Sequence, residues 1–442
     1  MHAAGLIIAA PASGSGKTCL TLGLLRLLAR QGVAVASAKV GPDYIDPAFH
    51  AAASGRPCLN LDPWAMRPAT LAHAVAALGA DASLIVCEGV MGLFDGATAA
   101  AGSTADVAAA LGWPVILVVD VRAQAASAAA VVRGFASHRA DVDVAGVIFN
   151  RVGSARHAAI LSEACAQALP AMPILGALPR LDGLGLPERH LGLVQAGEHP
   201  DLDAFVDRAA ELMAAHLDTG ALLALARPGR ASGFALPPAA AGPIAVLGQN
   251  IALADDAAFA FAYPLTLAGW RAAGAEIAPF SPLADEAPVA DADAVYLPGG
   301  YPELHAGLLA GNARFLAGLR AAAARDACVF GECGGYMVLG DGLIDADGNA
   351  HAMAGLLPLT TSFAQRRLQL GYRCATLQAQ TRLGAAGTAF RGHEFHYATV
   401  AHEGAGPALF AIEDAAGTPM GTAGRIRGSV AGSFIHLIDC EA

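Results

Sequence analysis

The stretch LIIAAPASGSGKT, residues 6–18, decides how the N-terminal part of the chain folds. Its first five residues are apolar and suit a buried strand, a Gly/Ser loop follows, and Lys17 and Thr18 open a helix-length segment. A strand, a glycine-rich loop and a helix in this order are typical of a phosphate-binding loop. The commonest pattern has glycine where this chain has Pro11, which indicates a variant of the loop. We expect the backbone and side chains of six residues to hold nucleotide phosphates and Mg²⁺: Ser13, Gly14, Ser15, Gly16, Lys17 and Thr18.

The sequence around this loop alternates short apolar runs with helix-length segments as far as about residue 180. The apolar runs are residues 6–10, 33–40, 84–87, 115–119, 144–149 and 174–178. This alternation predicts a parallel sheet wrapped by helices, and residues 202–216 suit a closing helix.

The chain has 442 residues, which is too long for one ordinary core. Residues 217–242 are rich in Pro, Gly and Ala without periodicity, as in a linker. We therefore expect a first domain over 1–216 and a second α/β domain over 243–442. The second should begin with a strand at Ile244, continue with helices at about 257–273 and 306–325 and strands at 294–297 and 328–330, and end in strands.

Composition narrows the class of protein. The net charge is -11 and Lys and Arg together number only 27, which argues against nucleic-acid binding. The N-terminus lacks a basic segment and a cleavage site, and the longest uncharged stretch is broken by prolines, so we expect a cytoplasmic protein without a membrane span. The eight cysteines lack the spacings of a metal site. A protein acting on small molecules is the best prediction.

Polar residues follow the predicted strands of the first domain. Lys39, Asp43 and Asp46 come after the second strand, Glu88 ends the third apolar run, and Asp95 lies in the glycine-rich loop beyond it. Carboxyl ends of parallel strands share one edge of the sheet, where ligands bind. Carboxylates gathered there would repel one another unless Mg²⁺ neutralises them. For any one acid alone, a helix cap or a solvated loop residue is the better interpretation, but the set as a whole favours a metal site.

Asn150 ends a later strand, in GVIFNRV. Its amide could read a nucleotide base, and a turn-forming asparagine is nearly as good an interpretation.

The second domain contains FGECGGYMVLG, residues 330–340, with Cys333 between an acidic residue and two glycines. A cysteine on a tight turn between a strand and a helix is an exposed nucleophile whose thiol the helix N-terminus acidifies. The segment SFIHLID supplies His436 as its base. A buried apolar role fits Cys328 better than Cys333. The glycines expected around the oxyanion and the substrate are Gly299, Gly300 and Gly334.

These motifs together resemble the cobyrinic acid a,c-diamide synthase family of cobalamin biosynthesis. The match covers GLIIAAPASGSGKT, KVGPDYIDPAFH, NLDPWAM, CEGVMGLFDG, GVIFNRV, LPGGYPE, GECGGYMVLG, LGYR, GHEFHY and SFIHL, in order along nearly the whole chain. The resemblance implies a dethiobiotin-synthetase-like ATP domain followed by a class I glutamine amidotransferase domain. It implies that ATP phosphorylates the c and then the a acetate carboxylate of a corrinoid, and that ammonia from glutamine displaces the phosphate.

The resemblance also implies roles for particular residues. Thr18, Asp46 and Glu88 match metal and activation positions, Asp43 and Asp95 lie near the acceptor carboxylate, and Lys39 lies near the transferred phosphoryl group. Class I amidotransferases often have a glutamate two residues after the histidine. Ile438 stands there in this chain, so the third member of the catalytic set stays open, and Asp439 is one residue too far.

Several alternatives stay open at this point. The same two domains occur in cobyric acid synthase and in nickel-sirohydrochlorin diamide synthase, and a ParA-like switch ATPase with a relic second domain is a further alternative. The N-terminal half resembles family members from the aerobic route of cobalamin biosynthesis, which favours hydrogenobyrinate over cobyrinate as the substrate. Arg366, Arg367 and Arg373 suit the carboxylates of a corrinoid, or equally a solvated strand edge. No partner other than corrinoid, glutamine and ATP is expected, and a homodimer is left open.

Overall fold

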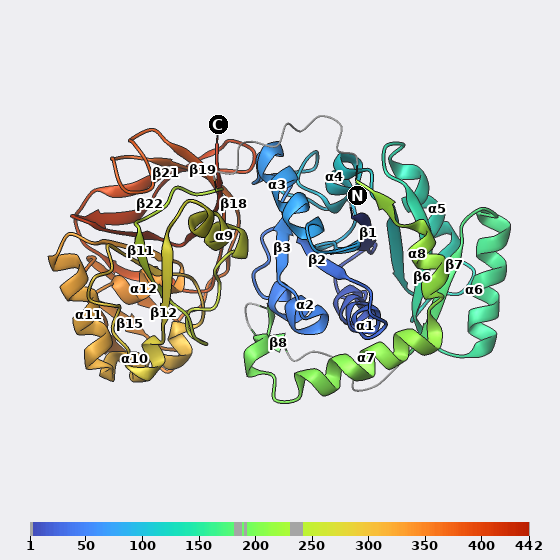
Figure 1. The fold of residues 1–442 in the computed structure, drawn as a ribbon, viewed down its shortest axis with the longest axis horizontal. Coiled ribbons are helices and arrows are strands. Elements are labelled where there is room, and N and C mark those ends of the chain that lie inside the picture. The colour runs from blue at the N-terminus through green and yellow to red at the C-terminus, as the bar shows by residue number, and fades with distance from the viewer. Residues whose placement is uncertain (1–2, 181–187, 190–191, 230–241, 442) are drawn as a thin grey trace. The chain divides into compact units, whose positions relative to one another are not determined.

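A computed structural model of the chain describes residues 3–180, 188–189, 192–229 and 242–441 (Figure 1). The chain divides into two compact units. One consists of residues 1–64 and 71–235, and the other of residues 65–70 and 236–442. The short piece 65–70 is therefore separated from its sequence neighbours and belongs to the second unit.

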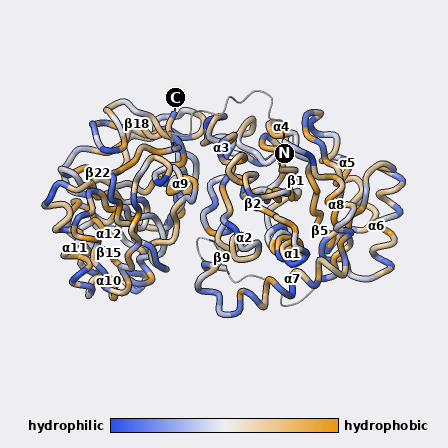
Figure 2. Tube along the Cα trace, in the orientation of Figure 1, coloured by the Kyte–Doolittle hydropathy of each residue, from blue (hydrophilic) through white to orange (hydrophobic). Residues whose placement is uncertain are grey.

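The first unit is built on a sheet with strand order β3-β2-β4-β1-β5-β6-β7. Every pair along this order is parallel, which confirms the predicted fold class. The central strands are buried except for one end residue each of β1 and β5, and Figure 2 shows their hydrophobic character. The strands are β1 Ala4–Ala9, β2 Val35–Val40, β3 Cys58–Leu61, β4 Leu84–Glu88, β5 Val115–Asp120, β6 Val144–Val152 and β7 Ile174–Pro179, with the two-residue pieces β8 Glu188–Arg189 and β9 Gly192–Leu193 outside the sheet.

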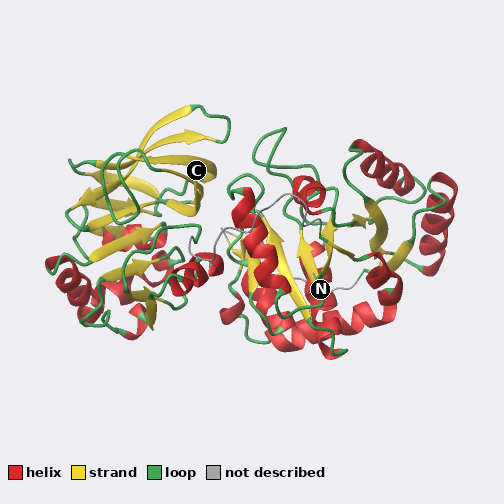
Figure 3. Ribbon diagram, turned by 45° about the horizontal axis from the view of Figure 1, so that its top comes forward, coloured by secondary structure: helices red, strands yellow, loops and turns green. Residues whose placement is uncertain are grey.

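Helices connect and flank these strands (Figure 3). They are α1 Lys17–Arg30, α2 Asp46–Ser54, α3 Pro68–Gly79, α4 Thr104–Leu111, α5 Ala128–His138, α6 Ala155–Ala168 and α7 Leu202–His216, with a 3-10 turn η1 at Ala196–Glu198. Helix α1 starts directly after Gly16, whose φ of 91° lies in the left-handed region. A side chain there would be strained, so this glycine lets the loop turn sharply into the helix. The strand, loop and helix order predicted for residues 6–18 is present.

The structure differs from the sequence expectation after α7. The predicted linker 217–242 instead begins with helix α8, Thr219–Leu225, and strand β10, Arg227–Pro228. Strand β10 pairs antiparallel with the first two residues of β1, Ala4 and Gly5. Residues 230–241 of the predicted linker lie outside the described residues.

The second unit is built on a ten-stranded sheet of order β12-β11-β13-β14-β23-β22-β21-β18-β19-β24. Its first half is parallel and its second half antiparallel. The strands are β11 Asn250–Ala254, β12 Glu276–Phe280, β13 Ala294–Leu297, β14 Cys328–Glu332, β18 Gln369–Leu377, β19 Ala389–His396, β21 Ala408–Asp414, β22 Pro419–Arg427, β23 Val430–Ser433 and β24 Ile435–Cys440. A smaller sheet, in the order β16-β15-β17-β20, holds β15 Gly342–Ile344, β16 Ala350–Ala352, β17 Leu359–Ser362 and β20 Thr399–Glu403.

The helices of the second unit are short. They are α9 Pro264–Ala272, α10 Ala306–Gly311, α11 Ala313–Ala324 and α12 Gly334–Leu339, with 3-10 turns η2 at Pro282–Ala284 and η3 at Pro302–His305. The predicted strand-rich end of the chain is present in β18 to β24.

The strand predicted at Ile244 is absent, and the first strand among the described residues of this unit is β11. Ile244 and Leu247 are buried in a hydrophobic cluster nonetheless. The indole of Trp270 donates to the carbonyl oxygens of Ile244 and Ala245. An apolar run indicates burial, and here a side chain takes the place of a neighbouring strand in satisfying the backbone.

Among the described residues, no helix combines the length and the apolar character needed to cross a membrane.

Candidate active sites

The phosphate loop of the first unit is shaped by its own hydrogen bonds. Gly14 and Gly16 both have positive φ, and the Ser15 hydroxyl donates to the Ala12 carbonyl at 2.8 Å. Lys17 is 7% exposed and its Nζ donates to the Met91 carbonyl at 2.6 Å. Burial lowers the pKa of the Lys17 ammonium to about 8, against the opposing effect of Glu88. The lysine is therefore held over the loop by carbonyl groups, where a phosphate would supply a stronger partner.

Three of the predicted metal and activation residues meet beside this loop. The Thr18 hydroxyl donates to Glu88 Oε1 at 2.7 Å and lies 3.4 Å from Asp46 Oδ2. Lys39 Nζ lies between the same two carboxylates, 2.5 Å from Asp46 Oδ2 and 2.9 Å from Glu88 Oε1. The sheet register explains the pairing, because Lys39 stands opposite Glu88 on neighbouring strands. The buried ammonium of Lys39 thus pairs with both carboxylates, and the predicted Mg²⁺ at this place stays a prediction.

The charge states follow from this arrangement. Burial raises the pKa of Asp46 to about 7, with Asp43 adding to the rise and Lys39 opposing it. Burial also raises the pKa of Glu88, but Lys39 and His50 outweigh it and hold that pKa well below its usual range. The pKa of Lys39 is raised well above its ordinary value, because Asp46 and Glu88 overcome the effect of burial. Glu88 and Lys39 are therefore charged at neutral pH.

His50 is a site residue that the sequence analysis missed. It is fully buried on α2, and its Nε2 lies 2.7 Å from the second oxygen of Glu88. Its Nδ1 lies 3.6 Å from the sulfur of Cys58 on β3. The histidine holds Glu88 through its Oε2 atom, so that Oε1 contacts Thr18 and Lys39. The only available signal was its place at the end of the GPDYIDPAFH motif.

Asp43 and Asp95 take part in local backbone turns. Asp43 Oδ1 accepts from the backbone N–H groups of Ile45 and Asp46, and its other oxygen lies 3.9 Å from Lys39 Nζ. Asp95 Oδ2 accepts from the Gly92 N–H at 2.9 Å. Both acids therefore accept hydrogen bonds from the backbone of local turns, and their predicted place near an acceptor carboxylate stays a prediction.

Asn150 is engaged with the loop itself. Its Nδ2 donates to the Ser15 carbonyl at 2.8 Å and its Oδ1 accepts from the Arg151 N–H. The Arg151 guanidinium binds the Gly14 carbonyl and Asp120 Oδ2. The amide therefore braces the phosphate loop, and its predicted contact with a nucleotide base stays a prediction. Asp120 and Arg151 are further loop-supporting residues that sequence reasoning missed.

In the second unit, Cys333 lies on a strained turn between β14 and α12. Its φ is 47° and its ψ is -102°, an arrangement that a non-glycine residue rarely adopts. Its N–H donates to the Ser433 carbonyl at 2.8 Å, and its carbonyl accepts from Met337. A Cβ on Gly335 would lie 2.0 Å from the Leu297 carbonyl oxygen, so only glycine allows this turn to approach β13. The sequence GECGG thus forms the predicted nucleophile turn.

His436 meets this turn from β24. A Cβ built on Gly299 would lie 2.3 Å from His436 Cε1 and 3.3 Å from Cys333 Cβ. The imidazole and the cysteine therefore converge on the small space that this glycine leaves. Gly300 and Gly334 are also in contact, since a Cβ on Gly334 would lie 3.0 Å from the Gly300 nitrogen. All five residues predicted for this site lie together.

Both partners of this pair are deeply buried. Burial raises the pKa of the Cys333 thiol well above its usual range, and the nearby Glu303 adds to the rise. Burial lowers the pKa of His436 to about 3, and His393 and His396 add to the fall. The expectation of an exposed and acidified thiol is therefore wrong for the resting site, because Cys333 is 1% exposed and burial outweighs the hydrogen bond from Gly334. The resting pair is a neutral thiol beside a neutral imidazole, and a thiolate requires the histidine to take the proton.

The contacts of Asp439 bear on whether this acid is the third catalytic residue beside Cys333 and His436. This carboxylate is fully buried and is bound by the backbone N–H and the guanidinium of Arg67, with a shortest guanidinium distance of 2.8 Å. Arg67 comes from the piece 65–70 that belongs to the second unit. Asp439 thus forms an ion pair with Arg67. The residue opposite His436 on the neighbouring strand β19 is His393.

The arginines of SFAQRRLQLGYR divide into two kinds. Arg373 is 5% exposed, and its Nε donates to Glu394 Oε2 at 2.8 Å, while His396 lies 2.9 Å from the other oxygen. Arg373 therefore belongs to a buried network, which corrects its predicted contact with a substrate. Arg366 and Arg367 are exposed and remain available for one.

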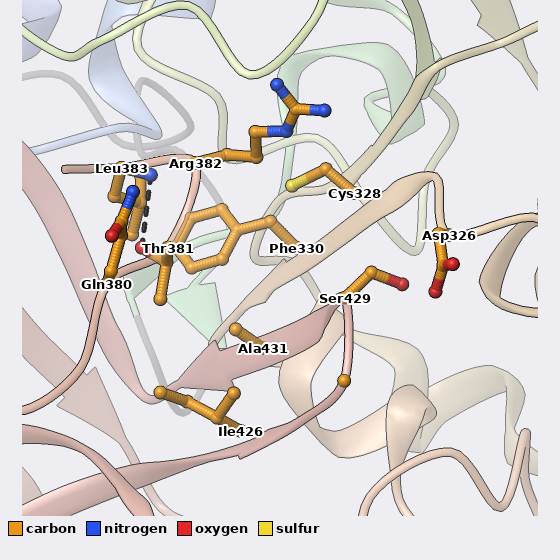
Figure 4. Close-up of a pocket in the computed structure, with 11 residues that line it drawn as sticks. Asp326, Cys328, Phe330, Gln380, Thr381, Arg382, Leu383, Ile426, Ser429 and Ala431 are labelled. Carbon is orange, nitrogen blue, oxygen red and sulfur yellow. Dashed lines mark hydrogen bonds between the residues drawn. The ribbon is translucent and has the colours of Figure 1, made fainter. Parts of the chain in front are cut away.

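A surface hollow of about 500 Å³ lies elsewhere in the second unit (Figure 4). Asp326, Cys328 and Arg382 are among the residues that line it. It opens at the start of β14, whereas Cys333 follows the end of the same strand. The hollow is therefore separate from the cysteine site.

A phosphate loop with buried acids in one unit, and a cysteine–histidine pair in the other, define a two-site synthetase of the glutamine amidotransferase class. Comparison with known families agrees. Residues 6–194 match the CobQ/CobB/MinD/ParA nucleotide binding domain, and residues 250–441 match the CobB/CobQ-like glutamine amidotransferase domain.

Full-length relatives identify the family. Proteins named hydrogenobyrinate a,c-diamide synthase are similar to this chain in Rhizobium meliloti (strain 1021), a Sinorhizobium species and Rhodobacter capsulatus. They are 56%, 55% and 54% identical, and each alignment covers 98% of this chain and 98–99% of the relative. The chain belongs to the hydrogenobyrinate a,c-diamide synthase family, as the motifs in its sequence predicted.

Proposed function

We propose that this chain converts the a and c acetate side chains of hydrogenobyrinate to amides, using ATP and glutamine. The observation that carries the proposal is the convergence of Cys333 and His436 at Gly299, in a chain that also holds a phosphate loop. The sequence identity of its relatives over nearly the full length supports hydrogenobyrinate as the acceptor rather than cobyrinate.

Ammonia is generated at the cysteine. The Cys333 sulfur attacks the side-chain amide carbon of glutamine while His436 takes the thiol proton. The carbon–nitrogen bond then breaks, His436 returns the proton to the leaving nitrogen, and ammonia departs. Water hydrolyses the remaining glutamyl thioester to glutamate. Backbone N–H groups around Gly299, Gly300 and Gly334 are the candidates to bind the oxyanion that forms.

The acceptor carboxylate is activated at the phosphate loop. A carboxylate oxygen attacks the γ-phosphorus of ATP, ADP leaves, and an acyl phosphate results. Lys17 contacts the oxygens of the β and γ phosphates, and the positive charge of Lys39 stabilises the transferred phosphoryl group. Ammonia then attacks the acyl carbon and phosphate leaves.

The oxygens of Thr18, Asp46 and Glu88 fit Mg²⁺. One hydroxyl and two carboxylates converge within hydrogen-bond distances, and Mg²⁺ commonly takes one or two carboxylates with phosphate oxygens and water. When bound, the ion would neutralise charge on the β and γ phosphates.

Arg366 and Arg367 are proposed to contact carboxylates of the macrocycle. Both are exposed, and the exposed Leu368 and Leu370 beside them suit the apolar part of such a substrate. An unchanged corrinoid KM in Arg366→Ala and in Arg367→Ala would refute this contact.

The decisive experiment offers hydrogenobyrinate and cobyrinate separately to the purified protein with ATP, Mg²⁺ and glutamine. Mass spectrometry should show two amides gained on hydrogenobyrinate, and a gain on neither acid would overturn the proposal. Cys333→Ser should lose glutaminase activity and glutamine-dependent amidation but still use added ammonium. A switch ATPase with a relic second domain would show no glutaminase activity to lose.

A further inference from the structure

The residue before the nucleophile, Glu332, is buried in an apolar part of the second unit. It is 3% exposed and lies among Tyr296, Phe330 and Leu437, which belong to one hydrophobic cluster. Burial raises the pKa of its carboxyl to about 7. Burying a carboxyl group in such surroundings costs free energy unless hydrogen bonds compensate for the lost water. The hydrogen bonds of Glu332 therefore indicate why a carboxyl group stands at this position.

The two oxygens of Glu332 bind two different strands. Oε2 accepts from the Tyr296 hydroxyl on β13 at 2.7 Å. Oε1 accepts from the backbone N–H of Leu437 on β24 at 3.0 Å, although the two residues are 105 positions apart. Leu437 is the next residue after His436, so this bond holds the backbone beside the imidazole.

Strand pairing provides this connection only indirectly, because β23 ends at Ser433 opposite Glu332 and β24 begins two residues later at Ile435. β14 pairs with β13 and β23, and β24 pairs with β19, so among the described strands no backbone ladder joins β14 to β24. Cys333 follows the end of β14 and His436 lies on β24. A side chain of β14 therefore ties the strand of the histidine to the strand that ends at the nucleophile.

We propose that Glu332 is a positioning residue, which sets the separation of the Cys333 sulfur and the His436 imidazole by holding the Leu437 N–H. This rests on the proposed cysteine–histidine glutaminase. The role needs an acceptor of the right length and no negative charge, so glutamine at 332 should replace it and alanine should not. Neither residue 332 nor Tyr296 contacts substrate in this account.

The test compares Glu332→Ala, Glu332→Gln and Tyr296→Phe in the full chain. A shift of about 1 Å in reacting groups costs roughly 100-fold in rate, so Glu332→Ala should lower the glutaminase kcat by about 100-fold with a nearly unchanged KM for glutamine. Glu332→Gln should restore kcat to within about threefold, and Tyr296→Phe should lie between them, because the Leu437 bond remains. Glu403→Ala, which removes a paired glutamate on β20, is the matched control and should keep wild-type kcat.

Two further readouts keep the result interpretable. Amidation supported by added ammonium should be unchanged in all variants, because it bypasses the cysteine. The rate at which a glutamine-like chloroketone alkylates Cys333 should fall in Glu332→Ala, which reports reactivity of the thiol without turnover. If Glu332→Ala does not fold, Glu332→Gln and Tyr296→Phe still carry the test.

A wild-type kcat in Glu332→Ala, or a Glu332→Gln enzyme as slow as Glu332→Ala, would overturn the inference. The first result would mean that the bond to Leu437 is dispensable, and the second that the charge matters. Neither outcome touches the proposed function, which fails separately if Cys333→Ser keeps glutaminase activity.

Discussion

Replacing Arg67 by alanine should loosen the strand that carries His436. In the second unit the Asp439 carboxylate is fully buried and accepts from the Arg67 backbone N–H, Nε and Nη2. Arg67→Ala keeps the backbone bond but removes the positive charge. The carboxylate would then be a buried charge without its counterion, three residues after His436.

The size of the effect follows from burial. Breaking a buried ion pair by removing one partner costs about 3–5 kcal/mol. Because the Arg67 side chain is 29% exposed, water can replace part of the lost contact, and we expect the lower end, about 3 kcal/mol. Arg26 offers a matched control in the first unit. Its partner Asp203 is 86% exposed, so Arg26→Ala should cost about 0.2–1 kcal/mol.

Native-state hydrogen exchange measures this locally. Amides in the peptide that covers residues 435–440 should exchange roughly 100-fold faster in Arg67→Ala, since each 1.4 kcal/mol is a factor of about ten. The same peptide in Arg26→Ala should exchange at the wild-type rate. A change below about fivefold in Arg67→Ala would correspond to about 1 kcal/mol and would refute the reasoning, because it would place this pair among surface ion pairs.

Three other predictions follow from single contacts. Gly299→Ala should abolish glutaminase activity, because its Cβ would lie 2.3 Å from His436 Cε1, whereas Gly311→Ala, with open space around it, should be fully active; equal activities would contradict the site geometry. Asp46→Asn should impair amidation with either nitrogen source while glutaminase activity remains measurable, and equal loss of both activities would count against separate sites. Glu332→Gln should gain stability relative to wild type as pH rises from about 4.5 to 7, because over that window the folded carboxyl holds a proton that the unfolded chain has lost. The gain is at most about 3 kcal/mol. Urea midpoints of the two proteins that differ by a constant amount from pH 5 to 8 would contradict this prediction.

The parts of this protein that sequence patterns predicted are those encoded in contiguous segments. The apolar runs of the first unit became strands β1, β2, β4, β5, β6 and β7, since a strand buried on both faces must be apolar along its length. Strand β3 was missed because it is only four residues long and contains Asn60. Residues 244–247 show the converse error, because their apolar character reflects packing without strand pairing.

The candidate sites divide in the same way. The phosphate loop and the turn at Cys333 are local, because glycine positions and the strand before them already define the backbone path. The roles of individual side chains were harder to predict. The contact of Asn150 with the loop was not predicted, because its partner Ser15 lies 135 residues earlier in the chain. Its predicted contact with a nucleotide base stays a prediction.

The sequence by itself determined the fold class and the family and predicted the reacting groups, because each depends on a short motif whose residue types have few other uses. Only the tertiary structure decided which groups support them. Lys39 between two carboxylates, Glu332 on the Leu437 N–H and Arg67 on Asp439 join positions up to 372 residues apart. Such contacts depend on sheet register and burial, and no local pattern of residues records either.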